Sequence, residues 1–106
     1  MISDDRLQKA LTYLATTDES AARARALMEG LSDQRKTVKA IGFLDASGTR
    51  DERESSAYVS SEYREHGKRY EDAVFEYEAL RNKRSTEALI VEVWRSEQAN
   101  RRAGNV

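Results

Sequence analysis

The chain has 106 residues and a formal net charge of −1, with 35% charged and 39% apolar residues. It contains no cysteine, which excludes disulfides and cysteine-based zinc sites. The near-neutral charge gives no overall attraction to nucleic acid or to an anionic membrane. Proline is absent and only five glycines are present, too few for the many turns of an all-β protein. We therefore predict a single all-α domain, residues 1–106, built as a helical hairpin or bundle.

The N-terminal half of the sequence predicts two helices. The first is a short helix over residues 3–17, with Ser3 as the N-cap and two acidic residues in its first turn. Thr17 is the expected cap of a second helix over residues 18–46. Apolar residues in that segment recur at steps of three and four, which is typical of heptad packing. They are Ala24, Leu27, Leu31, Val38 and Ile41.

The C-terminal half predicts a short helix over residues 50–59 and a long one over residues 62–101. Thr49 and Glu52 have the spacing of a capping box, and Ser60 or Ser61 can cap the long helix. The long helix has heptad-like spacing of apolar and aromatic residues, and about forty residues make a rod of about 60 Å. A chain this short cannot cover such a rod, so we predict a homo-oligomer, a dimer or higher. The residues expected at its interface are Tyr77, Leu80, Val91 and Trp94.

Basic residues concentrate in the same two long helices. Arg81, Lys83 and Arg84 fall within one helical turn, and antiparallel folding would bring cations of the second helix near them. Together they would form a phosphate or nucleic-acid site, to which the second helix contributes Arg23, Arg25, Arg35 and Lys36. The alternative is a solvated face on which these residues pair with neighbouring acids. In that interpretation Arg84, at a heptad position, forms an ion pair between helices.

Other residues that often carry chemistry give no catalytic pattern. Tyr63, Tyr70 and Tyr77 recur every seven residues, which indicates core packing rather than base stacking. His66 is the single histidine, and on a charged helix we expect it at the surface, without a metal. No glycine-rich phosphate loop and no nucleophile motif occurs in the sequence. We predict no enzyme activity, no catalytic residues and no cofactor.

The sequence also bears on location. No apolar run approaches the ~20 residues of a membrane span, and residues 1–5 lack the features of a secretory signal. We therefore expect a cytoplasmic protein with no membrane association.

The run of residues 81–95, RNKRSTEALIVEVWR, and the ANRR at 99–102 carry a family resemblance. This segment resembles the ending of small uncharacterised proteins of tailed bacteriophages. The resemblance implies a bacterial host cytoplasm during infection and a role around phage DNA or host defence. It assigns a role to no residue.

Three functions are compatible with these patterns. The first is a non-catalytic accessory protein for recombination or replication, or an inhibitor of a host defence complex, acting as a helical oligomerisation and protein-interaction module with an unidentified partner. The alternative is a nucleic-acid-binding accessory protein that uses the basic residues of the two long helices. A small phosphorylated ligand bound between subunits would use the same arginines.

Overall fold

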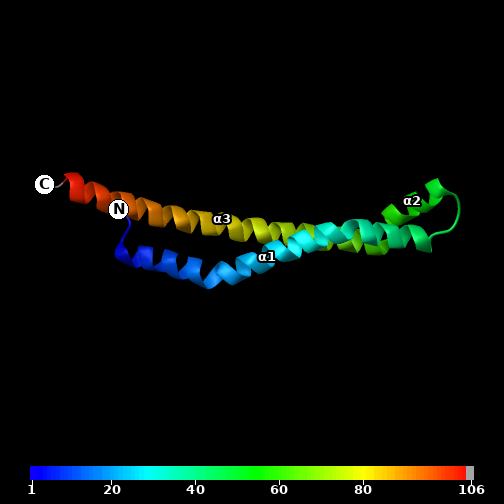
Figure 1. Ribbon diagram of the computed structural model, residues 1–106, viewed down its shortest axis with the longest axis horizontal. Helices are drawn as coiled ribbons and strands as arrows, with labels where there is room; N and C mark the ends of the chain where they lie inside the picture. The colour runs from blue at the N-terminus through cyan, green and yellow to red at the C-terminus, as the bar shows by residue number, and fades with distance from the viewer. Residues whose placement is uncertain (105–106) are drawn as a thin grey trace. The chain divides into compact units, whose positions relative to one another are not determined.

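The computed structural model describes residues 1–104, and all of its regular structure is helical. The three helices are α1 (Asp4–Asp45), α2 (Arg50–Val59) and α3 (Ser61–Gly104), shown in Figure 1. They contain 42, 10 and 44 residues. The prediction of an all-α fold with a long C-terminal helix is confirmed. None of the helices, over the described residues, combines the length and the apolarity needed to cross a bilayer.

The helix ends follow the capping signals in the sequence. The Ser3 hydroxyl accepts a hydrogen bond from the Arg6 amide at 3.0 Å, and α1 begins at the next residue. Thr49 and Glu52 form the predicted capping box of α2, with both hydrogen bonds at 3.2 Å. The Ser60 hydroxyl accepts from the Tyr63 amide at 3.2 Å and so caps α3. These side chains satisfy amide groups that have no partner within their helix.

Two predicted boundaries were wrong. The break at residue 17 is absent, because α1 runs without interruption from Asp4 to Asp45. Thr16 and Thr17 donate to the carbonyl oxygens of Thr12 and Tyr13, at 2.8 and 2.7 Å, as hydroxyls inside a helix do. At the other end, α3 continues past the predicted residue 101 to Gly104. Residues 105 and 106 lie outside the described part of the chain.

The predicted single domain contains two compact units. The terminal unit consists of Met1–Ala22 and the segment from Glu78 onward, so it pairs the first part of α1 with the second part of α3. The loop unit, Arg23–Tyr77, holds the rest of α1, all of α2 and the first part of α3. In each unit the segments of α1 and α3 run antiparallel, as Figure 1 shows.

A heptad seam runs along each long helix, defined by residues that are not exposed. Along α3 these lie at positions 63, 66, 70, 73, 77, 80, 84, 87, 91, 94 and 98. Along α1 they lie at positions 7, 10, 14, 17, 21, 24, 28, 31, 38 and 42. Steps of three and four residues, apart from the step of seven between residues 31 and 38 of α1, keep one stripe of each helix facing its partner. The heptad-like pattern expected from the sequence is thus present in both helices.

The face of α1 that carries this seam was predicted only in part. Leu27 and Ile41 are 54% and 52% exposed, and their neighbours Met28 and Gly42 occupy the seam instead. The reason at position 42 is the close approach of α2. A Cβ atom on Gly42 would lie only 3.3 Å from the Cα atom of Ala57, so an isoleucine cannot face α2 there.

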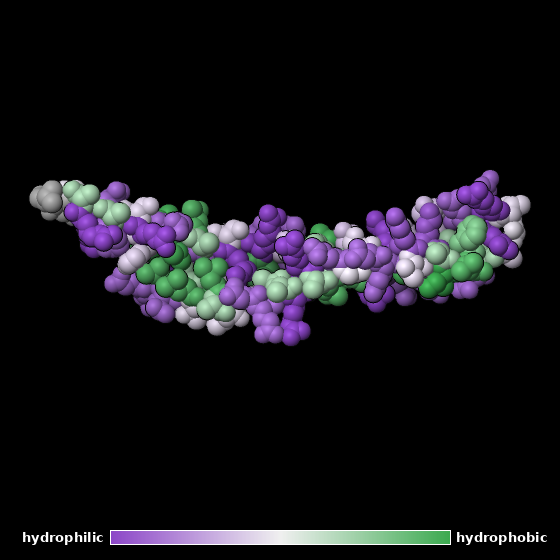
Figure 2. All heavy atoms as spheres, in the orientation of Figure 1, coloured by the Kyte–Doolittle hydropathy of each residue, from purple (hydrophilic) through white to green (hydrophobic). Residues whose placement is uncertain are grey.

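The interior of the described chain is small, and much apolar surface is open. Its buried apolar residues are Ala10, Leu31, Ala57 and Ala73. Exposed large apolar residues are more numerous, and Figure 2 shows apolar side chains at the surface of both units. They are Met1, Leu11, Leu27, Ile41, Leu44, Tyr58, Val59, Phe75, Leu89 and Val93. Two helices in contact cover one stripe of each other and leave the remaining faces to solvent or to a partner.

Candidate functional site

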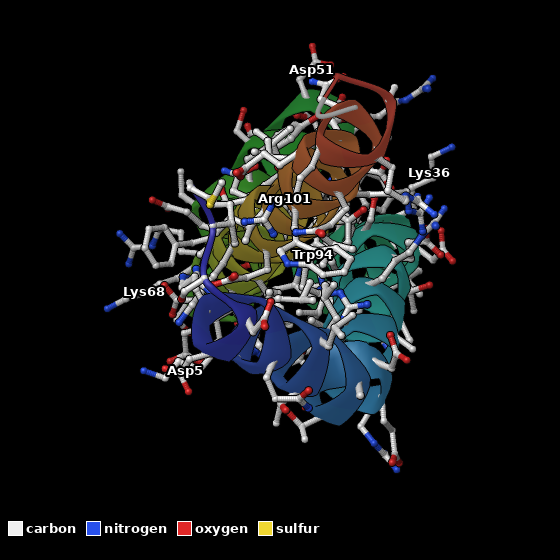
Figure 3. All side chains as sticks on the ribbon, turned by 90° about the vertical axis from the view of Figure 1, so that its left-hand side faces the viewer. Asp5, Lys36, Asp51, Lys68, Trp94 and Arg101 are labelled. Atoms are coloured by element: carbon white, nitrogen blue, oxygen red, sulfur yellow. The ribbon has the colours of Figure 1, made fainter. Side chains whose placement is uncertain are left out.

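The four residues predicted for an oligomer interface lie on the seam face of α3. Tyr77, Leu80, Val91 and Trp94 are all half-buried within the chain. Trp94 points between α3 and the start of α1 in the terminal unit, as Figure 3 shows, and its indole nitrogen donates to Asp4 Oδ1 at 3.3 Å. The residue therefore packs inside its own chain. Contact of these four with a second copy stays a prediction.

The seam of the terminal unit contains a polar layer built on Arg84. Its guanidinium donates to the carbonyl oxygen of Leu14 at 2.8 Å, to the Thr17 hydroxyl at 2.6 Å and to Asp18 Oδ1 at 2.5 Å. This ion pair joins α3 to α1, which confirms the predicted interhelical pairing of Arg84.

The next seam position of α3 extends the polar layer. Glu87 accepts two hydrogen bonds from Nη2 of Arg6, at 2.8 and 2.7 Å, and its side chain is only 13% exposed. A shift of α3 against α1 by one turn would break both sets of contacts. Charged groups at seam positions therefore favour one register, at which each finds its partner.

The other predicted phosphate-binding residues of the terminal unit also contact their own chain. Arg81 forms an exposed ion pair with Glu78 at 3.6 Å, one turn away on the same helix. The ammonium of Lys83 lies 4.7 Å from the centre of the Tyr13 ring, a cation–π contact between α3 and α1. Neither side chain is organised around an open anion site.

In the loop unit, three of the four predicted cations have contacts within the chain. Arg25 donates to Glu29 at 3.0 Å, and this hydrogen bond raises the pKa of Arg25 above its ordinary value. The guanidinium of Arg35 lies 5.5 Å from the centre of the Tyr70 ring. Arg23 also interacts within the chain. Lys36 makes no hydrogen bond or ion pair with the described residues. The convergence of these cations with Arg81–Arg84 stays a prediction.

His66 is the residue that the sequence reasoning placed wrongly. The side chain is 1% exposed, and neither ring nitrogen has a hydrogen-bond partner among the described residues. The signal that was missed is its spacing, since position 66 lies three residues after Tyr63 and four before Tyr70. Within residues 1–104, no three histidine, aspartate or glutamate side chains converge as they would around a metal ion.

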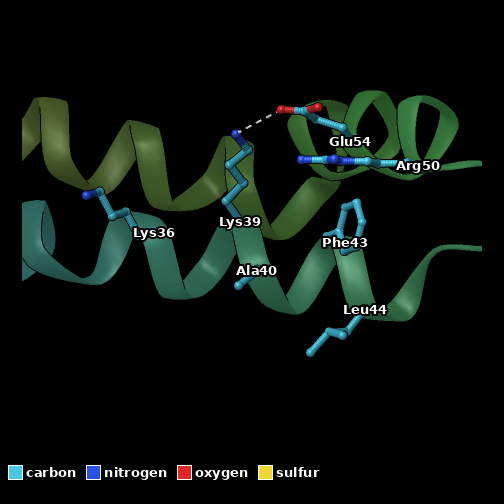
Figure 4. Close-up of a pocket in the computed structure, with 7 residues that line it drawn as sticks. All are labelled: Lys36, Lys39, Ala40, Phe43, Leu44, Arg50 and Glu54. Atoms are coloured by element: carbon cyan, nitrogen blue, oxygen red, sulfur yellow. Dashed lines mark ion pairs between the residues drawn. The ribbon is translucent and has the colours of Figure 1, made fainter.

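A hollow in the loop unit was not expected from the sequence, and we call it the basic hollow. Figure 4 shows the residues that line its volume of about 430 Å³: Lys36, Lys39, Ala40, Phe43, Leu44, Arg50 and Glu54. Five of these come from α1, at the spacing of one helical face, and two come from α2. A signal was present in α1, where two lysines precede Phe43 by one and two turns. The contribution of Arg50 depends on how the chain turns after α1.

The charged side chains around the basic hollow differ in whether they have a partner within the chain. Lys39 donates to the Tyr58 hydroxyl at 2.5 Å and pairs with Glu54 at 3.5 Å. The hydrogen bond to Tyr58 raises the pKa of Lys39 above its ordinary value. Lys36 and Arg50, in contrast, form no hydrogen bond or ion pair with any described residue. The hollow therefore combines apolar side chains with two cations that remain available to a ligand.

Comparisons of the chain with known proteins found no relative. No family model matches the chain, no curated protein matches its sequence and no solved structure matches its fold.

Proposed function

We propose that the protein is a non-catalytic helical interaction module that associates with a second copy of itself. The observation that carries this proposal is the set of large apolar side chains left exposed along both long helices and α2. Where such side chains form a contiguous surface, that surface is typical of a contact with another molecule. The charged seam residues support a structural role for the protein, because their side chains already form hydrogen bonds and ion pairs between α1 and α3.

The spacing of the exposed residues supports a helical partner. Phe75 and Leu89 lie two heptads apart on α3, with Val93 one turn further, and Leu27 and Ile41 lie two heptads apart on α1. Each long helix thus carries a second apolar row beside its seam, as a helix does in a four-helix bundle. A second copy supplies a pair of helices with the same period.

The available area is also of the right size. Eight of the exposed apolar side chains lie within helices and outside the basic hollow. At about 60–100 Å² each, they supply roughly 500–800 Å², and a standard interface buries about 800 Å² per partner. A net charge of −1 adds little repulsion between two copies.

The cellular setting forms part of the proposal. The resemblance of residues 81–102 to small tailed-phage proteins supports a bacterial cytoplasm during infection. There the assembled module would serve recombination or replication of phage DNA, or inhibit a host defence complex, through a further protein partner.

Sedimentation equilibrium tests the association. We expect the wild-type chain to form a dimer or higher oligomer, and the double variant Phe75→Ser, Leu89→Ser to shift toward monomer while keeping its helical circular dichroism. The control Asn100→Ser changes an exposed polar residue on the same helix and should leave the mass unchanged. A wild-type chain that stays monomeric up to its solubility limit would overturn the proposal.

Nucleic-acid binding is the alternative function, and it has less support. Six of the seven cations named for it make contacts within the chain, and the remaining one, Lys36, lines the basic hollow. Fluorescence anisotropy with labelled single- and double-stranded DNA across a salt series tests it. Binding that weakens steeply as salt rises would favour this alternative, since phosphate contacts release counterions. No binding at low salt would remove it.

A further inference from the structure

The basic hollow has a local structural origin in the loop between α1 and α2. α1 ends at Asp45, and Gly48 has a φ of +109°, a conformation that favours glycine. The chain therefore reverses, and α2 returns along the end of α1, which brings Arg50 and Glu54 beside Phe43. Figure 4 shows Phe43 pointing from α1 toward α2, and Lys39 reaching Glu54 along the dashed line. One wall of the hollow thus comes from each helix.

The charge balance of the hollow favours an anionic ligand. Its single carboxylate, Glu54, is already paired with Lys39. Lys36 and Arg50 then remain as two unpaired cations at its edge. A guanidinium can bind a carboxylate through two parallel hydrogen bonds, and a lysine adds a point charge.

The apolar residues of the hollow decide which anion fits. Leu44 is 74% exposed, Ala40 is exposed and Phe43 is half-buried. A nucleic-acid backbone presents phosphates and sugars, which gain little from a leucine and a phenylalanine. A peptide can place an aliphatic or aromatic side chain on these residues and its carboxylates on the cations. Sites of this kind combine apolar contact area with a few polar groups that set orientation.

We propose that the basic hollow binds an acidic segment of a partner protein, in which carboxylates flank an aliphatic or aromatic side chain. This inference deepens the proposed function, since it gives the chemistry of the further partner that the module engages. It needs only the loop unit of one chain, so it can be tested apart from association with a second copy.

The experiment uses a panel of fluorescein-labelled ten-residue peptides on the full chain. Each peptide has a central pair drawn from Leu, Phe and Trp, flanked by Asp and Glu, and each has a matched version with Asn and Gln. A labelled thymidine oligonucleotide is the phosphate probe. We expect the acidic peptides to bind and their amide versions to bind at least about tenfold more weakly, because two charge-assisted contacts are lost.

Variants locate the binding. Lys36→Glu with Arg50→Glu should weaken the acidic peptides by about tenfold or more, since both unpaired cations become acids. Leu44→Ser should weaken them several-fold, because an apolar contact is removed. The matched control is Arg64→Glu with Lys68→Glu. These are two exposed cations of the same unit that do not line the hollow. Figure 3 shows Lys68 pointing outward. The control makes the same charge change and should bind as the wild type does.

Four outcomes would overturn the inference. Three concern the wild-type chain: no binding across the whole peptide panel, equal binding of the amide versions, and tighter binding of the oligonucleotide than of the peptides. The fourth is peptide binding that falls equally in the control variant. Peptide binding by a chain that sediments as a monomer would overturn the proposed self-association and leave this inference standing. An oligomer that binds no peptide would do the reverse.

Discussion

Arg84 and Arg81 lie three residues apart on α3, and their surroundings predict different contributions to stability. The Arg84 side chain is 23% exposed and reaches three acceptors on α1, whereas Arg81 is 63% exposed and pairs with one carboxylate on its own helix. We expect Arg84→Ala to lower the free energy of unfolding by about 1–2 kcal/mol, since a carbonyl and a hydroxyl lose their partner. Arg81→Ala should lower the free energy of unfolding by less than about 0.5 kcal/mol.

Urea unfolding followed by circular dichroism measures both variants. Equal losses would mean that the polar layer of the terminal unit does not hold α1 to α3. In that case the half-exposed apolar residues of the seam would have to carry the contact alone.

His66 presents the opposite situation, a buried polar group without a partner. A buried donor that makes no hydrogen bond costs about 1–3 kcal/mol of desolvation. Leucine has a similar volume and no polar atom, so His66→Leu should raise the free energy of unfolding by about 1 kcal/mol. His66→Ala is the control and should lower it, because it leaves a cavity. Loss of stability in His66→Leu, measured in the same urea series, would show that the ring has a polar partner in the assembled protein.

At the scale of helices, two glycines of α1 predict opposite effects of the same substitution. A Cβ atom at Gly30 would meet nothing within 4 Å, whereas one at Gly42 would meet Ala57 and Ser60 at 3.3–3.4 Å. Alanine favours a helix interior over glycine by about 1 kcal/mol, so Gly30→Ala should stabilise the protein by about that amount.

Gly42→Ala should gain less than Gly30→Ala or lose stability, because α2 must move away from α1. The difference between the two variants in thermal or urea unfolding isolates the contact between α1 and α2. If both variants gain the same stability, α2 can move away from α1 at no cost in free energy and does not pack closely at residue 42.

For the whole molecule, the exposed apolar residues predict a stability that depends on concentration. A second copy that binds the folded chain stabilises it by mass action. We therefore expect Tm to rise by several degrees over a hundredfold increase in protein concentration, measured by circular dichroism. In the Phe75→Ser, Leu89→Ser variant this dependence should vanish. A wild-type Tm independent of concentration would contradict the association.

Much of this architecture was predictable from sequence because helix ends are local events. A capping side chain binds an amide two or three residues away, so the caps at Ser3 and Thr49 were predicted, and Ser60 was one of the two serines expected to cap α3. The predicted helix start at Thr17 was wrong because a threonine hydroxyl can either cap a new helix or bond to the preceding turn of the same helix. In the structure the hydroxyl bonds back to Tyr13 and accepts from Arg84, a contact between helices that local sequence does not contain.

The sequence by itself determined the heptad period and placed Arg84 at a seam position, because both depend on residue types at regular steps along one helix. The tertiary structure decided which stripe of α1 faces inward, since Leu27 and Met28 are neighbours and both apolar. It also decided that His66 is buried and that Arg50 joins two lysines of α1 at the basic hollow. These features depend on where a second helix lies, and a helix with apolar residues on two adjacent stripes does not specify which one its partner covers.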